Sequence, residues 1–402
     1  MKSLILPLIL SVGTAFAVPT VSNVNVSQGG SGGPVKITYQ LDAPAIVTID
    51  VLTNGVSIGA EKLVGLTGDV NRLVPQAGEG RVTWRPHKIW PGDPIEGTTV
   101  KVRAWATNAP PDYLVYDFVN HTTNFYTCVE ALPDGGLAND VYRTDRIVLR
   151  KIPAKGVEWV MGCYNKDVGA TASAVAHMVV LTEDFYMAIY ETTQAQYVHS
   201  GSSYATGFNY TGDDAAIHPA DKVNFWHLHG DWPTAGRKSP GGACASFRKT
   251  TGIDFDLPTE AQWEFACRAG TRTMINTGHA LTSTTADENM NAAGWSTANS
   301  KEGYSALSSH PVGKKLKNAW GLYDMHGNIS EWCLDWFGTI SGDAVDPIGA
   351  TTNGGSGRVL RGGGFAYSNV SGCTSSVRNV DGGAGGVQDR GFRLICPVTL
   401  KW

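Results

Sequence analysis

The sequence contains no C-x-x-C pair, no run of lysine or arginine and no recognisable nucleophile elbow. The first absence leaves a zinc ribbon and a thioredoxin-type redox site without support. Basic and acidic residues nearly balance, at 32 against 36, so the charge does not favour a nucleic-acid partner. Without a nucleophile elbow, the sequence has no recognisable Ser/His/Asp frame of a serine hydrolase.

Charged residues make up only 17% of the chain, whereas glycine is plentiful at 48 residues. This composition is typical of a loop-rich or β-rich protein outside the cytoplasm. Lys2 precedes an apolar segment at residues 4–12 and an A-x-A cleavage site at residues 15–17, which together predict a signal peptide over residues 1–17. A retained anchor is the alternative. No later apolar run is long enough to span a bilayer, so we expect a secreted, periplasmic or cell-surface protein without a transmembrane segment after cleavage.

Residues 18–107 alternate short β-branched segments with clusters of Gly, Pro and Asn. The segments at 35–39, 46–51, 82–84 and 98–105 predict a small β-sandwich of immunoglobulin-like type. Nothing in this domain carries chemistry, so a spacer or an adhesion module is expected. Residues 108–141 are predicted to be a linker with one extra strand around 113–119, and a second domain is predicted over residues 142–402.

Two helices in the second domain are indicated by their first turns. Thr193 and Gln196 have the spacing of a capping box, and so do Thr259 and Gln262. In the second helix Glu264 is followed four residues later by Arg268, which predicts an ion pair along one face. These are structural signals that need no functional explanation.

Four motifs then occur in order, and together they resemble the sulfatase-modifying-factor family, whose best-known member is the formylglycine-generating enzyme. They are FDLPTEAQWEFACRAGT (255–271), HPVGKKLKNAWGLYDMHGNISEWCLDWF (310–337), RVLRGGGF (358–365) and DRGFRLIC (389–396). The segment EDFYMAIYETTQAQY (183–197) is similar to the family's first helix, so the resemblance covers residues 142–397. It implies an α+β, loop-rich domain of the C-type-lectin-like kind.

The family is functionally mixed, so the fold alone does not imply an activity. The oxidases of the family that this sequence resembles convert a cysteine of a sulfatase to formylglycine, using molecular oxygen and Cu(I). In those oxidases two cysteines that follow the RGG motif bind the Cu(I) ion. In this sequence those positions fall on Tyr367 and Gly372, beside Cys373. Tyrosine cannot replace a thiolate on Cu(I). Copper is therefore not expected, and Cys373 would be catalytic only if the oxidase alternative holds.

The chain has seven cysteines, so at least one is unpaired or bonded to another molecule. Disulfides persist outside the cytoplasm. The resemblance implies the pairs Cys244–Cys396 and Cys267–Cys373, with Cys267–Cys396 as a competing pair. Cys373 would then be a structural staple, with a reactive thiol as the alternative. The partners of the remaining cysteines are not assigned; these are Cys128, Cys163 and Cys333.

The segment DMHGNISE, at residues 324–331, is the strongest metal-site candidate. Ca²⁺ prefers oxygen ligands, and Asp324 and Glu331 place carboxylates at the two ends of this loop. The resemblance implies that the carbonyl groups of Gly327 and Ile329 complete a structural calcium site. A metal-free turn held by Asn328 is the alternative, and His326 is expected to point outward.

Aromatic and polar residues after the RGG motif predict a surface for a peptide, glycan or protein ligand: Phe365, Tyr367, Asn369 and Arg378. Plain loop packing is the alternative for this segment. The arginines at 361, 378 and 393 are expected to be buried with acids such as Asp389. The leading functional hypothesis is therefore an exported, non-copper binding or scaffold protein stabilised by calcium. A formylglycine-generating or other oxygen-dependent enzyme, and a cell-surface adhesion protein, remain alternatives.

Overall fold

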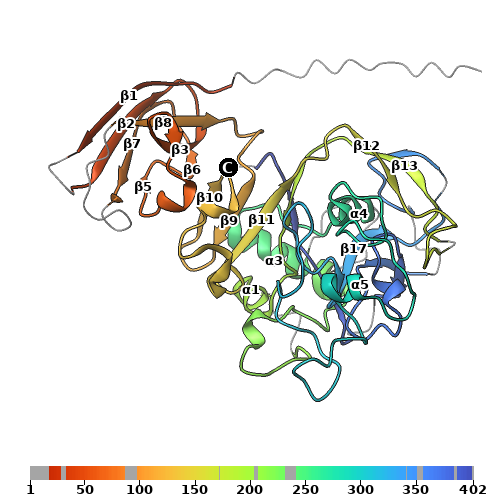
Figure 1. The fold of residues 1–402 in the computed structure, drawn as a ribbon. Helices are drawn as coiled ribbons and strands as arrows, with labels where there is room; N and C mark the ends of the chain where they lie inside the picture. Colours follow the sequence, from red (N-terminus) through yellow and green to blue (C-terminus); the bar gives the residue numbers. More distant parts are fainter. Residues whose placement is uncertain are drawn as a thin grey trace, which may run out of the picture. The chain divides into compact units, whose positions relative to one another are not determined.

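The computed structural model divides the chain into two compact units, residues 1–110 and residues 111–402 (Figure 1). It describes residues 18–28, 33–86, 97–171, 173–202, 207–230, 241–340, 342–350, 356–383 and 387–400. The predicted signal peptide, residues 1–17, lies outside the described residues. Within the described ranges, no helix combines the length and the apolar character that a bilayer crossing requires.

The first unit consists of two sheets that share one core. One sheet has the strand order β1-β2-β7-β5, and in the other β3 pairs with β4, β6 and β8. The strands are β1 (Val21–Gln28), β2 (Val35–Leu41), β3 (Ala45–Thr53), β4 (Val56–Ser57), β5 (Thr67–Gly68), β6 (Arg72–Val74), β7 (Gly78–Trp84) and β8 (Thr98–Trp105).

Alternation of side chains along β2 explains how the two sheets pack. Ile37 and Tyr39 point inward and are fully buried, and they contact a core that also contains Val47 and Val51 from β3. A period of two residues places one face of a strand toward the core, which is the pattern that the sequence predicted here. The four predicted strands are therefore present, and they lie in two layers; the immunoglobulin-like topology stays a prediction.

The second unit is built from small sheets, short helices and long connecting segments. Its strands are β9 (Tyr113–Asp117), β10 (Thr122–Tyr126), β11 (Arg146–Ile152), β12 (Val157–Met161), β13 (His177–Leu181), β14 (Phe185–Ala188), β15 (Gly294–Trp295), β16 (His326–Gly327), β17 (Ser330–Trp336), β18 (Ala344–Val345), β19 (Arg358–Arg361), β20 (Asn379–Asp381), β21 (Arg390–Gly391) and β22 (Ile395–Pro397). Its α-helices are α1 (Gln194–His199), α2 (Phe225–His229), α3 (Gly242–Thr251), α4 (Glu260–Arg268) and α5 (Glu288–Ala293). This mixture agrees with the α+β, loop-rich expectation.

The predicted linker belongs largely to the second unit, which corrects the sequence-based boundary at residue 142. Strands β9 and β10 join β11, β14 and β22 in an antiparallel sheet with the order β10-β9-β11-β14-β22. Four consecutive residues of β9, Leu114 to Asp117, are buried, because both faces of the strand are covered. The hydroxyl group of Tyr116, for example, donates a hydrogen bond to the carbonyl oxygen of Thr250 in α3, at 3.0 Å.

The two predicted capping boxes are confirmed. At α4 the hydroxyl group of Thr259 accepts the backbone N–H of Gln262 at 3.2 Å, and the Gln262 side chain accepts the N–H of Thr259 at 2.9 Å. Thr193 and Gln196 make the same reciprocal pair at α1. Because these bonds satisfy N–H groups that a helix leaves unpaired, they set where α1 and α4 begin.

Candidate functional site

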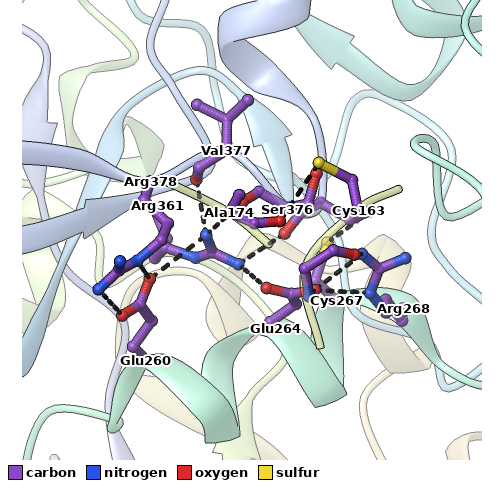
Figure 2. Close-up of polar contacts among 12 residues, drawn as sticks. Cys163, Ala174, Glu260, Glu264, Cys267, Arg268, Arg361, Ser376, Val377 and Arg378 are labelled. Atoms are coloured by element: carbon purple, nitrogen blue, oxygen red, sulfur yellow. Dashed lines mark hydrogen bonds and ion pairs between the residues drawn. The ribbon is translucent and has the colours of Figure 1, made fainter. Parts of the chain in front are cut away.

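Helix α4 carries two buried glutamates that bind arginines from distant parts of the chain (Figure 2). Glu260 accepts two hydrogen bonds from Arg378, at 2.6 Å from Nε and 2.9 Å from Nη2. Glu264 contacts both Arg361 and Arg268, the latter through Nε at 2.8 Å. The predicted pair of Glu264 with Arg268 is thus present, as one link in a longer chain of charges.

This buried ion-pair chain fixes the segment after β19 against α4. The guanidinium group of Arg361 also donates to the carbonyl oxygens of Ser375, Ser376 and Val377. Burial alone would raise the pKa of Glu264, but the charges of Arg268 and Arg361 outweigh burial and hold that pKa below its usual value. Glu264 therefore keeps its charge, and the network holds residues 375–378 in place.

The three arginines singled out in the sequence are buried and paired with acids, as expected. Arg361 and Arg378 bind the glutamates of α4, and Arg393 binds Glu331 at 2.8 Å. Asp389, the acid proposed as a partner, forms no ion pair with them in the described part of the chain. The sequence therefore predicted the role of these arginines but not their partners.

The structure divides the predicted ligand surface into two buried and two accessible residues. Phe365 is fully buried, and Arg378 is held by Glu260 and by the carbonyl oxygens of Ser173 and Gly338. Their expected exposure is therefore wrong, because packing and the ion-pair chain use both side chains. Tyr367 is half-buried and Asn369 is exposed, so these two remain available to a ligand.

Tyr367 and Gly372, the positions of the two copper ligands in the oxidases, lie against each other. A Cβ atom added to Gly372 would be 2.7 Å from Cδ1 of Tyr367, so the tyrosine ring covers this glycine. The adjacent Cys373 is buried, and burial together with the charge of Asp389 raises the pKa of its thiol to about 12. An aromatic ring and a glycine therefore occupy the two positions at which the oxidases have thiolates. The neighbouring thiol of Cys373 stays protonated near neutral pH.

The structure contains neither of the two expected disulfides, and all seven cysteines are free thiols. The Cys267 thiol instead contacts the carbonyl oxygen of Met325 at 3.7 Å and the hydroxyl group of Ser375 at 3.6 Å. Cys244 is also buried, and Cys396 lies next to the paired backbone of Asp256 and Ile395. Six of the seven cysteines therefore pack as small buried side chains, whereas the resemblance implied disulfide bonds.

The candidate calcium loop is held in shape by backbone conformation and by one asparagine. Gly327 has φ of 75°, and a Cβ atom there would lie 1.9 Å from the carbonyl oxygen of Trp295, so only glycine fits. The Asn328 side chain accepts the N–H of His310 at 2.8 Å and donates to Glu191 at 2.6 Å. His326 is buried and not outward as expected, because its ring bonds the carbonyl oxygen of Cys373 at 2.7 Å.

Around this loop three buried carboxylates face one buried arginine. Glu331 is fully engaged by Arg393 and by the indole N–H of a buried tryptophan, at 2.8 and 2.7 Å. Asp324 accepts one backbone N–H, but its Oδ1 atom is buried without a partner among the described residues. Burial raises the pKa of Glu191 well above its usual value, and the charges of Asp324 and Glu331 add to the effect.

The sequence interpretation missed Glu191, which was seen only as part of a helix start. Its two oxygens accept the N–H of Ile329 at 3.0 Å and the amide group of Asn328 at 2.6 Å. The sequence did contain a signal for this role, because Glu191 directly follows the apolar segment FYMAIY. Burying a charge beside such a segment is costly unless the charge has hydrogen-bond or ion-pair partners. Glu191 therefore supports the loop from a distant part of the chain.

Within the described residues, no three His, Cys, Asp or Glu side chains are placed to hold one metal ion. A cation at the loop would therefore depend on backbone carbonyl groups as well as on Asp324 and Glu331. The unpartnered oxygen of Asp324 and the excess of buried carboxylates fit a cation, whereas Glu331 would have to share its oxygens with Arg393. The donor set, all oxygen, suits calcium rather than a soft metal.

Part of the chain is similar in sequence to known formylglycine-generating enzymes. The chain is 34% identical over 122 residues to the formylglycine-generating enzyme of Streptomyces coelicolor, covering 27% of this chain and 35% of that protein. It is 33% identical over 118 residues to the corresponding enzyme of Thermomonospora curvata, covering 27% and 38%. The match thus spans about a third of each curated relative.

Among solved structures, variable protein 1 of Treponema denticola superposes with a TM-score of 0.49 and 23% identity, over 63% of this chain and 95% of that one. The family model of the sulfatase-modifying factor enzyme 1-like domain matches residues 154–398, which is more than half of the chain. It covers α4, the candidate calcium loop and the segment of Tyr367 and Cys373. The chain therefore belongs to the family of sulfatase-modifying factor enzyme 1-like domains.

Proposed function

We propose that this protein is an exported, non-copper member of its family that binds a peptide or glycan ligand. The observation that carries the proposal is the contact of the Tyr367 ring with Gly372, at the two positions where oxidases place thiolates. Cu(I) needs soft sulfur ligands, and the cysteine beside these positions is the buried Cys373, whose thiol stays protonated near neutral pH.

The accessible part of the predicted ligand surface supports binding over catalysis. Tyr367 presents part of an aromatic ring and Asn369 an exposed amide group, a combination suited to stacking and to hydrogen bonds with a peptide or sugar. The backbone of this segment is held in place by a hydrogen bond, which the hydroxyl group of Thr297 donates to the carbonyl oxygen of Tyr367 at 2.8 Å. An immunoglobulin-like sandwich would then present or extend this domain at the cell surface.

Calcium is proposed as a structural ion of the loop at residues 324–331. The side chains of Asp324 and Glu331 and the carbonyl groups of Gly327 and Ile329 would hold it. Bound there, the ion would supply positive charge against three buried carboxylates, of which Glu331 is paired with Arg393. It would act as a structural ion, because the loop offers oxygen ligands and holds the chain in a tight turn.

An assay of formylglycine formation tests the proposal. The full chain is incubated with a Cys-x-Pro-x-Arg peptide, Cu(I), a reductant and oxygen, and the peptide is analysed by mass spectrometry. We expect no aldehyde at the peptide cysteine. Aldehyde that disappears in Cys373→Ala would instead establish the oxidase alternative with one unconventional ligand.

A double variant provides the matched control, because it restores the two thiols. The residue Gly372 has no positive φ, and Tyr367→Cys removes the ring that a side chain at 372 would meet, so Tyr367→Cys/Gly372→Cys should fold. Cu(I) binding by this variant, against none by the natural chain, would show that the copper site is lost through these two positions. Binding of Cu(I) by the natural chain would contradict the proposal.

Ligand binding is tested on glycan and peptide arrays with the full chain. The Tyr367→Ala and Asn369→Ala variants should lose the signal that the natural chain gives, and Val345→Ala, which changes an exposed residue of β18, should keep it. Signal that survives in the first two variants but requires residues 18–110 would favour the adhesion alternative.

A further inference from the structure

A pocket lies in the second unit, between β12 and the C-terminal end of α4. It has a volume of about 270 Å³ and one wall made of three aromatic rings. Phe265 lies between the two tryptophans, with ring centroids 5.3 Å from Trp159 and 5.2 Å from Trp320. The rings are tilted by 59° and 52°, so they form a continuous apolar wall and not a flat stack. None of these residues belongs to the candidate ligand surface or the calcium loop.

Two residues of opposite charge are also among those that line this pocket. Glu158 comes from β12 and Arg272 follows α4, and both are exposed. Within the described residues neither side chain has a hydrogen bond or an ion pair, and they do not pair with each other. The third charge of the lining, Arg268, is fully engaged by Glu264 and by two backbone carbonyl oxygens.

We propose that this pocket binds a free α-amino acid with an aromatic or large apolar side chain. The side chain would lie on the aromatic wall, the ammonium group would face Glu158 and the carboxylate would face Arg272. Aromatic rings prefer tilted or offset contacts at such walls, and Arg pairs well with a carboxylate. A volume of about 270 Å³ is at the small end for ligand pockets, which favours one amino acid over a larger ligand.

Charge complementarity distinguishes this occupant from related ones. An aromatic acid without an ammonium group would pair with Arg272 but leave Glu158 without a partner, and an aromatic amine would pair with Glu158 but leave Arg272 without one. A ligand with both charges satisfies both residues at once, which neither a neutral ring nor a singly charged one can do. The exposed position of both residues means that each contributes a modest share of affinity.

The test is calorimetric titration of the full chain with phenylalanine, N-acetylphenylalanine and phenylalaninamide. We expect phenylalanine to bind, and each derivative to bind roughly two- to fivefold more weakly, because each lacks one charge that would pair with an exposed residue. The variants then assign the charges. The Arg272→Gln variant should bind phenylalanine more weakly, and it should bind phenylalanine and phenylalaninamide with equal affinity. The Glu158→Gln variant should bind phenylalanine and N-acetylphenylalanine with equal affinity.

Two further variants make the result specific to the pocket. Trp320→Ala should abolish binding while Trp320→Phe keeps most of it, since the half-buried ring forms part of the wall. Tyr367→Ala should leave binding unchanged, so failure here and failure of the proposed ligand surface are distinguishable. Equal binding of phenylalanine and both derivatives, or no binding by the natural chain, would overturn the proposal.

Discussion

Among single residues, the arginines buried beside α4 are expected to matter most for stability. Among the described residues, Arg361→Ala would leave the buried Glu264 with Arg268 as its one charged partner, and it would remove three bonds to backbone carbonyl groups. Breaking one partner of a buried pair leaves an uncompensated charge, so we expect a loss of about 3–5 kcal/mol in the free energy of unfolding. Urea unfolding followed by circular dichroism measures it.

The matched control is an exposed ion pair in the same unit. Lys155 and Glu183 lie 3.2 Å apart with side chains 65% and 76% exposed, so Lys155→Ala should cost under about 1 kcal/mol. Equal losses in the two variants would contradict the view that the ion-pair chain is a structural clamp.

A pH dependence is expected from His218, whose buried ring stacks on Tyr210 and bonds Tyr304. Burial lowers the pKa of His218 to about 4, with a smaller opposing effect from Asp214. The unfolded chain would bind a proton on this ring at about pH 6.5, whereas the folded protein would not until about pH 4. Stability from this group is therefore present above about pH 6.5 and lost as the pH falls toward 4, by on the order of 3 kcal/mol.

The measurement compares the free energy of unfolding of the natural chain and His218→Gln between pH 4 and 7. The difference between the two curves isolates this residue from His310, whose pKa burial also lowers. We expect the natural chain to show the steeper decline toward acid. Parallel curves would mean that His218 does not titrate with folding.

At the scale of structural elements, the loop between Tyr323 and β17 should respond to calcium. Calcium that binds only the folded state stabilises it by about 2.7 kcal/mol at a concentration of a hundred times Kd. We therefore expect CaCl2 to raise the melting temperature and EGTA to reverse the increase. Asp324→Ala should abolish the response, while Glu183→Ala, which removes an exposed carboxylate, should keep it. A calcium response that persists in Asp324→Ala would place the ion elsewhere.

Elements with a local signal were predictable from the sequence, and elements without one were not. The capping boxes of Thr193 and Thr259 fixed the start of α1 and α4, since the signal lies within four residues. Strand β10 was missed and β9 was assigned to a linker, because the flanking Pro110–Pro111 and Pro133 indicate a connection. Their place in the sheet depends on pairing with β11, which is not visible in the segment itself.

In the candidate site, too, some features were predictable from the sequence and others were not. The order of the motifs along the sequence is enough to place Tyr367, Cys373 and the loop of Asp324 in one domain. Burial of Phe365 was not predictable, because an aromatic residue in a glycine-rich segment is compatible with either packing or exposure. Glu191 was missed for a related reason: its partners lie more than 130 residues away in the chain.

At the scale of the whole molecule, each compact unit has its own hydrophobic core. Among the described residues, the core cluster of the first unit lies between Val21 and Ala104, and the clusters of the second unit lie between Tyr113 and Ile395. Cores that do not share members should fold independently. Residues of the former linker, among them Val115, Tyr126 and Leu132, belong to the second core.

The position of the boundary can therefore be tested by comparing two shortened chains. A chain that begins at Pro111 keeps β9 and β10, whereas one that begins at Tyr142 leaves β11 as an exposed edge and removes buried residues such as Leu114. We expect the first to unfold in one cooperative transition. The second should be destabilised by several kcal/mol or fail to fold, because loss of a large core residue alone costs about 2–5 kcal/mol. Equal stability of the two chains in urea would restore the boundary at residue 142, and would mean that the five-stranded sheet does not need its first two strands.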